Sequence, residues 1–581
     1  MDQILEREAF KSEALFLGGI NFPSESLLES LNAKSGEVIG FIAPLTQGDL
    51  QNEGLLDAFC LWRNENQFAY PTRFHATPDS TRNWLSGVLS GGQRILFKLM
   101  NRSYELVGHI GLAWNAGRDR LELDSVQRGR PGSSGLMSSA VKWIENYAQK
   151  EFISHDLHLR VLESNQHAVD FYIGLGYTIE SSEPVVISDS SHDQASDLHD
   201  EFLSMVRELE LSSPVKAEIL TAGPSIGYRE RLYAADAVQR GWNQNHSDYL
   251  KRLQDSFASF VGSKHALATS SCTGALHLAF ASLGIGPGDE VIVPAVTWVA
   301  TASAVAYTGA TPVFIDVDPV TWTLDPAKVM SSITPATKAI VAVHLYGFLA
   351  DVTQLRQLAD AHEIYLVEDA APAIGATLDG RKAGTFGHFG CYSFQGAKLL
   401  VSGEGGMLVT DSPELFARAV KFQEHGRKPG TFWIEELGYK YKMSNLTASL
   451  ALGQLERALP QIFKKRKISD WYRNALQGVE GLHFQEEIAN SSSIHWMTSI
   501  KLFGIHSGKR EELTAHLKSL GIDTRPVFPN ISKFAFWGGE PQAFPAADEI
   551  ADNGINLPSG VGLTRKDVEY VAKSIKAYLD A

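Results

Sequence analysis

The chain has 581 residues, 44% of them hydrophobic, and its formal net charge is −15. This length is more than one hydrophobic core supports, so two or three domains are expected. The acidic balance argues against nucleic acid as a partner, and three scattered cysteines argue against both a disulfide framework and a metal site. The charged N-terminus and the lack of a long apolar stretch predict a cytoplasmic protein with no membrane partner.

Strands and helices alternate in the first part of the chain. Alternating apolar residues predict strands at 94–100, 105–114, 120–126 and 157–162. A glycine-rich loop at 129–135 precedes apolar residues at helical spacing, and another helix is predicted at 165–175. Residues 181–216 begin with a polar run and carry one short amphipathic stretch, so we expect a linker that contains a single helix.

The remainder of the chain has a β-α-β rhythm. Short, nearly continuous apolar runs occur at 290–293, 312–317, 338–344, 365–368, 390–394 and 407–410. Such runs are typical of strands buried on both faces, so they predict a largely parallel sheet covered by helices. From about residue 466 the pattern becomes that of a smaller α+β unit. The predicted fold class is α/β for the whole chain.

Lys398 follows a short apolar strand and precedes the glycine-rich turn 403–406. A lysine held at the edge of a sheet loses some of its affinity for a proton through burial. Its neutral amine can then form a Schiff base with an aldehyde cofactor. For a lone lysine, a surface position beside a tight turn is the simpler interpretation.

Three further signals accompany this lysine. Asp369 ends a buried strand and could pair with a pyridinium nitrogen, although for an aspartate taken alone a helix cap is the more common role. Small and hydroxylated residues at 270–276 open a helix and could hold a phosphate. Trp298 lies just beyond another strand and could stack on a planar ring or fill the core. Together the four signals indicate pyridoxal 5'-phosphate.

The residues from about 220 to the end resemble the nucleotide-sugar aminotransferases of the DegT/DnrJ/EryC/StrS family, in the fold-type-I pyridoxal-phosphate class. The resemblance is carried by segments 286–294, 309–314, 343–347, 368–371, 393–398, 403–406, 438–445 and 524–528. It implies a large domain at 217–465 and a small domain at 466–581.

The resemblance also implies chemical roles for individual residues. Lys398 is expected to bond to the cofactor, Asp369 to hold the pyridine nitrogen, and Trp298 to stack on the ring. A dehydratase branch of the family has histidine in place of this lysine, so Lys398 favours transamination, with glutamate as the amino donor. Arg525 and His344 are candidate substrate contacts, and His344 could equally be a histidine of the core edge.

The phosphate site implied by the family involves two subunits. Thr273, Ser393 and the backbone N–H of Cys272 are expected to bind the phosphate, with Cys272 standing where the family usually has glycine. The family's site lies at a homodimer interface, where segment 438–445 reaches the phosphate of the partner. Lys440 in this segment stands where asparagine is common.

Residues 37–180 resemble the GNAT acetyltransferases. Segment 159–165, followed by Ala168, Tyr172 and Gly176, matches the C-terminal motif of that family, and the loop at 128–135 is a looser match to its pyrophosphate motif. A plain turn is the alternative interpretation of this loop.

The GNAT resemblance implies a set of contacts with acetyl-CoA. Its pyrophosphate is expected to bind Arg128, Gly129, Arg130, Gly132, Ser133 and Gly135. Asn165 is expected to contact the cofactor, and Tyr172 to protonate the departing thiolate, unless Tyr172 only packs in the core. Glu122 or Asp124 could accept a proton from the attacking amine, or both could lie on a solvated strand face.

The two resemblances predict a bifunctional enzyme. An N-terminal extension (1–36), a GNAT-like domain (37–180) and a linker (181–216) precede the aminotransferase domains. We expect transamination of a nucleotide-linked keto sugar, with 4-keto-6-deoxy the expected pattern, and N-acetylation of the product for surface polysaccharide. Three alternatives stay open: a GNAT-like domain that only binds or regulates, a sensor without turnover, and a 3-keto substrate.

Overall fold

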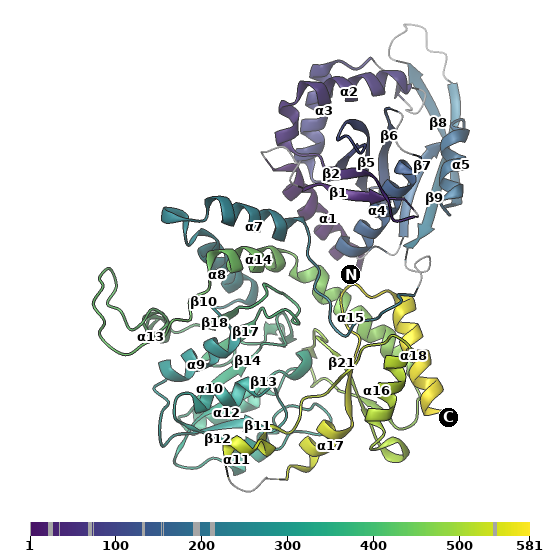
Figure 1. Ribbon diagram of the computed structural model, residues 1–581. Coiled ribbons are helices and arrows are strands. Elements are labelled where there is room, and N and C mark those ends of the chain that lie inside the picture. The colour runs from purple at the N-terminus through teal and green to yellow at the C-terminus, as the bar shows by residue number, and fades with distance from the viewer. Residues whose placement is uncertain are drawn as a thin grey trace. The chain divides into compact units, whose positions relative to one another are not determined.

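The computed structural model describes residues 2–20, 27–33, 35–67, 72–73, 75–130, 134–152, 154, 156–189, 198–209, 215–538 and 543–580. The chain divides into two compact units, Met1–Ser213 and Pro214–Ala581 (Figure 1). Within the described ranges, none of the helices has the length and apolar character needed to span a membrane.

The first unit is built on a nine-stranded sheet in the order β1-β2-β4-β5-β6-β7-β9-β8-β3. Its strands are β1 (Glu29–Asn32), β2 (Val38–Pro44), β3 (Thr72–Arg73), β4 (Arg94–Met100), β5 (Leu106–Asn115), β6 (Arg120–Arg128), β7 (Asp156–Leu162), β8 (Thr178–Asp189) and β9 (Leu198–Glu208). Neighbouring strands are antiparallel except for the pairs β6–β7 and β3–β8. The four strands predicted between residues 94 and 162 are confirmed as β4 to β7.

The helices of the first unit are α1 (Asp2–Gly18), α2 (Glu53–Glu65), α3 (Pro78–Gly91), α4 (Leu136–Phe152) and α5 (Gln166–Gly174). Local signals explain the ends of α3, where Thr77 and Ser80 form a capping box and Gly92 ends the helix with a φ of 66°. A shared apolar cluster packs α2 and α3 against Leu96 of β4.

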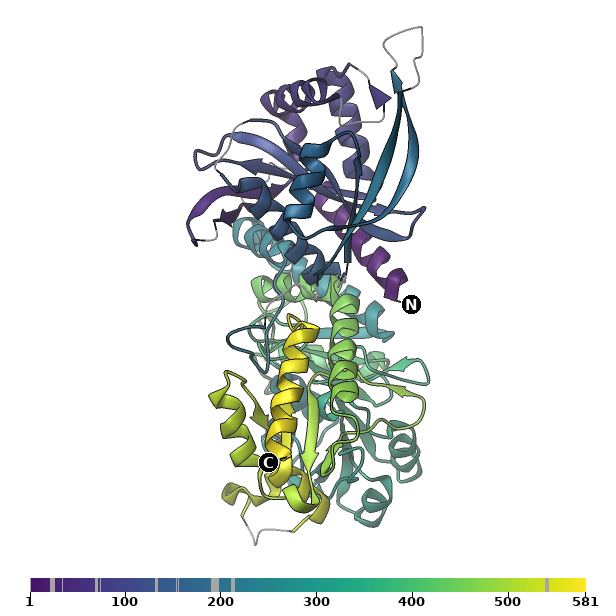
Figure 2. The same cartoon turned by 90° about the vertical axis from the view of Figure 1, so that its right-hand side faces the viewer.

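The prediction of a helical linker at 181–216 is wrong. This segment contains much of β8 and all of β9, which pairs with β7 from Asp156↔Glu208 to Leu162↔Phe202. Figure 2 shows β8 and β9 as a long twisted ribbon. Leu203 and Met205 are both buried, and their two-residue spacing is that of a strand. The N-terminal residues also belong to this unit, because Phe10 is buried against Phe152.

The second unit contains a seven-stranded sheet in the order β10-β18-β17-β14-β13-β11-β12. Its strands are β10 (His265–Thr269), β11 (Glu290–Pro294), β12 (Thr311–Ile315), β13 (Thr337–Val343), β14 (Tyr365–Asp369), β17 (Phe389–Ser393) and β18 (Gly406–Thr410). Within this sheet β18 runs in the opposite direction to the other strands, which are mutually parallel, so the predicted parallel character is confirmed. Ile292 lies in one apolar cluster, and Val291 and Val293 lie in another, because helices cover both faces.

The helices of this unit are α7 (Tyr228–Arg240), α8 (Asp248–Val261), α9 (Cys272–Ser282), α10 (Ala300–Ala306), α11 (Pro326–Ser331), α12 (Val352–Ala361), α13 (Pro413–Gln423), α14 (Asn445–Glu456), α15 (Ala458–Ala475), α16 (Arg510–Ser519), α17 (Pro545–Asn553) and α18 (Arg565–Leu579). A three-stranded sheet joins β15 (Thr377–Leu378), β16 (Arg381–Lys382) and β20 (Ser491–Ser492).

The C-terminal part of the second unit has an antiparallel sheet of its own, in the order β19-β21-β23-β22. Its strands are β19 (Leu482–Phe484), β21 (Thr498–Leu502), β22 (Arg525–Pro526) and β23 (Gly554–Leu557). Apolar residues of α15, α16 and α18 pack on it. Ile219 forms a bridge with Ile522, so the segment that enters the second unit joins this C-terminal part rather than the large sheet.

Candidate active sites

Most of the residues predicted for the pyridoxal-phosphate site meet at one cavity of about 450 Å³ in the second unit. The cavity is lined by Cys272, Thr273, Trp298, Asp369, Ser393 and Lys398, among others. They come from the start of α9, from the ends of β14 and β17, and from the loops that follow β11 and β17. The carboxyl ends of parallel strands meet at one edge of the sheet, which explains how distant segments form one site.

Lys398 lies in the turn after β17, where its backbone N–H donates to the Gln395 carbonyl at 2.8 Å. Its Nζ lies 3.7 Å from the centroid of the Trp496 ring. Burial lowers the pKa of Lys398 to about 8, against an opposing effect of the Asp369 charge. A larger share of the amine is therefore neutral at physiological pH than for an exposed lysine, as a nucleophilic lysine requires.

Asp369 is held in one orientation at the end of β14. Thr301 Oγ1 donates to its Oδ2 at 2.7 Å, and the Ala371 N–H donates to its Oδ1 at 3.2 Å. The carboxylate is only 6% exposed, and residues 370–376 form turns, so Asp369 does not cap a helix. Both supporting donors are neutral, and the negative charge remains available to a cationic group in the cavity.

The start of α9 provides the anion-binding end of the cavity. Ser271 caps the helix by accepting from the Gly274 N–H at 3.0 Å, and the amides of Cys272 and Thr273 lie in the first turn, which has no acceptors within the helix. A Cβ at Gly406 would lie 2.6 Å from the Cys272 nitrogen, so this approach requires glycine. Burial, followed by the Asp369 charge, raises the pKa of Cys272, which keeps the thiol neutral beside an anion.

Aromatic rings form the other wall of the cavity. Trp298 is 58% exposed, and its ring centroid lies 5.6 Å from that of Phe528. Tyr346 stacks on Phe528 at 5.3 Å and on Trp496 at 5.9 Å. The cavity thus combines an amine, a fixed carboxylate, a helix N-terminus and flat apolar surfaces. These features fit pyridoxal 5'-phosphate, with its aldehyde, ring nitrogen, phosphate and aromatic ring.

Trp496 was not predicted from the sequence, although it contacts Lys398. Its Nε1 donates to the Ala397 carbonyl at 2.8 Å, and its own carbonyl accepts from Lys465 Nζ at 2.7 Å. Burial lowers the pKa of Lys465 to about 7. The available signal was an aromatic residue directly before an apolar strand, which is too common to assign a role.

Three other predicted residues have different positions. Arg525 lines the outer part of the cavity. His344 is fully buried, and its Nε2 lies 2.9 Å from Glu368 while Nδ1 accepts from the Ala350 N–H, as expected for a histidine of the core edge. Lys440 does not line this cavity. Its neighbour Tyr441 accepts a hydrogen bond from the Ser270 N–H at 2.6 Å, so segment 438–445 runs beside the phosphate end of the cavity.

A second cavity, of about 340 Å³, lies in the first unit at the start of α4. Arg128, Arg130 and Gly135 line it, and Gly132 and Ser133 lie outside the described residues. The contact expected from Gly129 is not available. Its N–H donates to the Val107 carbonyl at 2.9 Å, and a Cβ there would lie 1.8 Å from the Trp62 ring. Gly129 is thus a packing position.

Two predicted residues come from α5. Asn165 caps the helix, with its Oδ1 accepting from the Ala168 N–H at 3.4 Å. Tyr172 is buried, and burial together with the nearby charge of Asp124 raises the pKa of its hydroxyl. The hydroxyl therefore stays protonated at physiological pH, as a proton donor must. Glu122 and Asp124 lie two residues apart on one face of β6.

The comparisons with known proteins concern the second unit. The sequence profile of the DegT/DnrJ/EryC1/StrS aminotransferase family matches residues 224–576. GDP-perosamine synthase of Caulobacter vibrioides is 36% identical over 369 residues, which cover 62% of this chain and 98% of that protein. GDP-perosamine synthase of Vibrio cholerae is 37% identical over 363 residues, covering 61% and 98%. The spore coat polysaccharide biosynthesis protein SpsC of Bacillus subtilis is 38% identical over 270 residues, covering 45% and 69%.

Solved structures show the same likeness. The aminotransferase TlmJ from Streptoalloteichus hindustanus is 31% identical, with a TM-score of 0.60, and the match covers 62% of this chain and 99% of TlmJ. DesI, solved in the presence of its TDP-sugar product, is 29% identical with a TM-score of 0.58, covering 64% and 95%.

Proposed function

This chain belongs to the DegT/DnrJ/EryC1/StrS aminotransferase family and is a pyridoxal-phosphate-dependent nucleotide-sugar aminotransferase, and we propose that it uses glutamate to aminate a 4-keto-6-deoxy nucleotide sugar. The observation that carries this proposal is the cavity of about 450 Å³ that Lys398 and Asp369 share. The likeness to SpsC favours a product destined for surface polysaccharide.

Each residue of the cavity would have a separate role in transamination. Pyridoxal phosphate, when bound, supplies an aldehyde that takes up an amine and a ring that accepts electrons from the reacting carbon. Asp369, fixed by Thr301 and the Ala371 N–H, would keep a proton on the ring nitrogen. The Lys398 amine has a pKa near physiological pH, so it can both remove and return a proton at the substrate carbon. The amides at the start of α9, with the Thr273 and Ser393 hydroxyls, would hold the phosphate.

A substrate panel tests this assignment. The full chain is incubated with glutamate, pyridoxal phosphate and GDP-, UDP- and dTDP-linked sugars that carry a ketone at C3 or at C4. We expect NMR to show an amine at C4 of one 4-keto-6-deoxy sugar. Amination only at C3, or of no sugar in the panel, would contradict the proposal.

The second unit also carries support for a homodimer. Phe432 and Leu437 are 95% and 87% exposed, and they lie directly before segment 438–445. Burial of such apolar side chains by a second copy would be favourable. We expect a dimer in sedimentation experiments and a larger monomer fraction for the double variant F432S/L437S. A wild-type monomer at assay concentrations would contradict this part of the proposal.

For the first unit we propose acetyl-CoA-dependent N-acetylation of the amino sugar. Three observations support it: the cavity lined by Arg128 and Arg130 at the start of α4, the protonated hydroxyl of Tyr172, and the parallel pairing of β6 with β7 in a sheet that is otherwise antiparallel except at the edge pair β3–β8. Arginines and a helix N-terminus suit a pyrophosphate. A sugar amine is also what the second unit would produce.

Release of CoA thiol tests this activity. With acetyl-CoA and a 4-amino sugar nucleotide, the wild-type chain is expected to release CoA, and Y172F to release it at least about 10-fold more slowly. Equal and negligible release from both proteins would favour a unit that only binds or regulates.

A further inference from the structure

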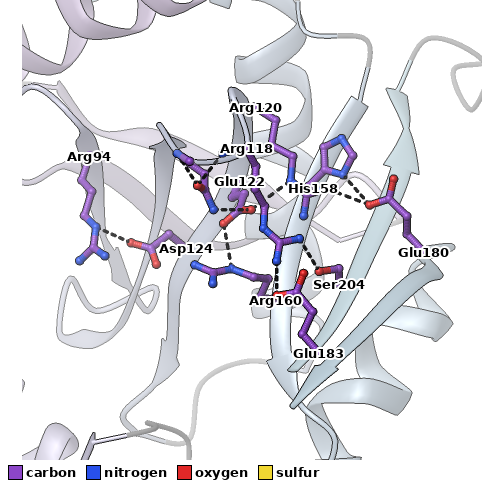
Figure 3. Close-up of polar contacts among 12 residues, drawn as sticks. Arg94, Arg118, Arg120, Glu122, Asp124, His158, Arg160, Glu180, Glu183 and Ser204 are labelled. Carbon is purple, nitrogen blue, oxygen red and sulfur yellow. Dashed lines mark hydrogen bonds and ion pairs between the residues drawn. The ribbon is translucent and has the colours of Figure 1, made fainter. Parts of the chain in front are cut away.

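One face of the sheet in the first unit carries a polar network (Figure 3). Arg120, Glu122 and Asp124 alternate along β6 and therefore share this face. Arg160 of β7 and Arg94 of β4 lie on either side of them in the sheet. The two carboxylates on β6 are the groups between which the sequence could not choose.

Glu122 is enclosed by donors. Asn115 Nδ2 and Arg120 Nε donate to its Oε1 at 2.9 and 3.1 Å, and Arg160 Nε donates to its Oε2 at 3.3 Å. The residue is 5% exposed. Both carboxylate oxygens are thus engaged, and two guanidinium groups balance the charge. Glu122 has no open side toward a substrate.

The network continues to the strands beyond β7. Arg120 Nη1 donates to Glu180 at 2.9 Å, and Arg118 donates to Ser204 at 3.1 Å and pairs with Glu183 (Figure 3). These contacts join β6 and the turn before it to β8 and β9. The part of the network around Glu122 therefore fixes the relative positions of the central strands.

Asp124 lies outside this enclosure, beside Arg94 (Figure 3). Ser125 Oγ donates to its Oδ2 at 3.0 Å, and Arg94 Nε lies 3.2 Å from the same oxygen. Within the described chain, Oδ1 has no hydrogen-bond partner. The side chain is partly exposed, with 26% of its surface accessible. One oxygen of Asp124 can therefore meet an incoming molecule.

The pairing between β6 and β7 ends just before Asp124. The parallel pairing of β6 with β7 is limited to Glu122↔His158 and Leu123↔Leu159, so Asp124 is the first residue of β6 past the paired positions. Ser125 follows with a φ of 51°, where the β5–β6 register shifts. The Asp124 charge also acts on the Tyr172 hydroxyl of α5. Asp124 therefore lies where the pairing of β6 with β7 has ended, near enough to Tyr172 for its charge to help raise the pKa of that hydroxyl.

We propose that Asp124 accepts the proton of the acyl-acceptor amine and that Glu122 is a positioning residue. This rests on the acetyltransferase function proposed for the first unit. The amine nitrogen bonds to the thioester carbonyl carbon as the carbon–sulfur bond breaks. Asp124 Oδ1 takes the proton lost by the nitrogen, and the Tyr172 hydroxyl gives a proton to the CoA sulfur. The products are the N-acetyl sugar and CoA thiol.

The two carboxylates offer matched variants, D124N and E122Q, in the full chain. With acetyl-CoA and GDP-, UDP- and dTDP-linked 4-amino-4,6-dideoxy sugars, D124N is expected to lower kcat for acetyl transfer by at least about 100-fold. Its acetyl-CoA binding, melting temperature and transamination should match the wild type. D124E, which restores a carboxylate, should recover part of kcat. E122Q should instead lower the melting temperature and, where folded, keep kcat within about 10-fold of the wild type.

The outcomes distinguish the role proposed for Asp124 from the acetyltransferase function proposed for the first unit. A D124N variant that keeps kcat within about 3-fold, or an E122Q variant that loses kcat without losing thermal stability, overturns the assignment of Asp124 and leaves the acetyltransferase function standing. A wild-type chain that releases no CoA with any amine overturns both. A D124N variant that is inactive because it no longer binds acetyl-CoA also overturns the assignment.

Discussion

The two units each bury a carboxylate, but they surround it differently. Asp369 in the second unit is 6% exposed and accepts hydrogen bonds from a hydroxyl and a backbone N–H, with no ion-pair partner in the described chain. Glu122 in the first unit is 5% exposed and contacts two guanidinium groups. A buried charge needs compensation. For Glu122 the compensating positive charge comes from the protein. For Asp369 it would come from a bound cation, such as a protonated ring nitrogen.

The largest expected effect is on Asp369. D369N keeps the size of the side chain but removes the charge that would hold a proton on the cofactor ring. We expect transamination to fall by about 10³-fold, measured as amino-sugar formation from glutamate. The CoA release of the first unit serves as the internal control and should not change. Transamination within about 10-fold of the wild type would show that the charge of Asp369 has no special part.

The matched change in the first unit should act on stability instead. E122Q removes the buried anion that Arg120 and Arg160 share and leaves Arg120 with Glu180 alone. We expect the free energy of unfolding of this unit to fall by about 3 kcal/mol, measured by chemical denaturation of the full chain. The E53Q variant breaks the exposed pair of Glu53 with Arg82 and should change it by less than about 1 kcal/mol. Equal effects of the two variants would contradict the contrast.

A smaller effect is expected when the support of Asp369 is weakened but its charge is kept. T301V removes the hydroxyl that donates to Oδ2 at 2.7 Å. A hydrogen bond to a charged group contributes about 1.5–3 kcal/mol, so transamination should fall by roughly 10- to 100-fold. Thr308, outside the cavity, provides a control position in T308V. A T301V variant as inactive as D369N would mean that orientation, rather than charge, dominates.

The smallest effect concerns the proton affinity of Lys398. Burial places its pKa at about 8, and the Asp369 charge opposes that shift. The rate at which an amine-reactive reagent labels Lys398 in the cofactor-free protein should therefore rise as the pH passes about 8. Peptide mass spectrometry measures this labelling. In D369N the opposing charge is gone, so the midpoint should move to lower pH. A midpoint near that of the exposed Lys264 would contradict the effect of burial.

The same lysine has a consequence for stability. A lysine pKa that is lower in the folded than in the unfolded chain means that the unfolded chain binds more protons between pH 8 and the usual lysine range. The contribution of Lys398 to stability should thus become more favourable as the pH rises through this window. K398M should weaken that dependence in denaturation curves.

The sequence predicted those parts of the site that local patterns encode. Strand ends carry Asp369 and the Lys398 turn, and a capped helix start carries Cys272 and Thr273, so each could be recognised from a few neighbouring residues. Trp496 could not be predicted in this way, because its contact with Lys398 depends on how a distant strand packs.

The first unit shows the same limit more clearly. Glu122 and Asp124 lie two residues apart in one predicted strand and therefore share a face, so the sequence does not distinguish them. Their hydrogen-bond partners do, because Asn115 and Arg160, from other segments, bind Glu122. The segment of β9 is predicted as a helix because Phe202, Leu203, Val206 and Leu209 follow helical spacing, whereas the buried apolar side chains of Leu203 and Met205 follow a period of two.

The place of β9 between β7 and β8 has a consequence for synthesis on the ribosome. The last strand of the first unit to be translated is an interior strand of its sheet, so the sheet stays divided until residues 198–208 have emerged. Until then β7 presents an unpaired edge to the nascent chain. A recombinant fragment that stops near residue 180 would keep that edge, and we expect it to aggregate, whereas one that ends at Ser213 contains every strand of the sheet.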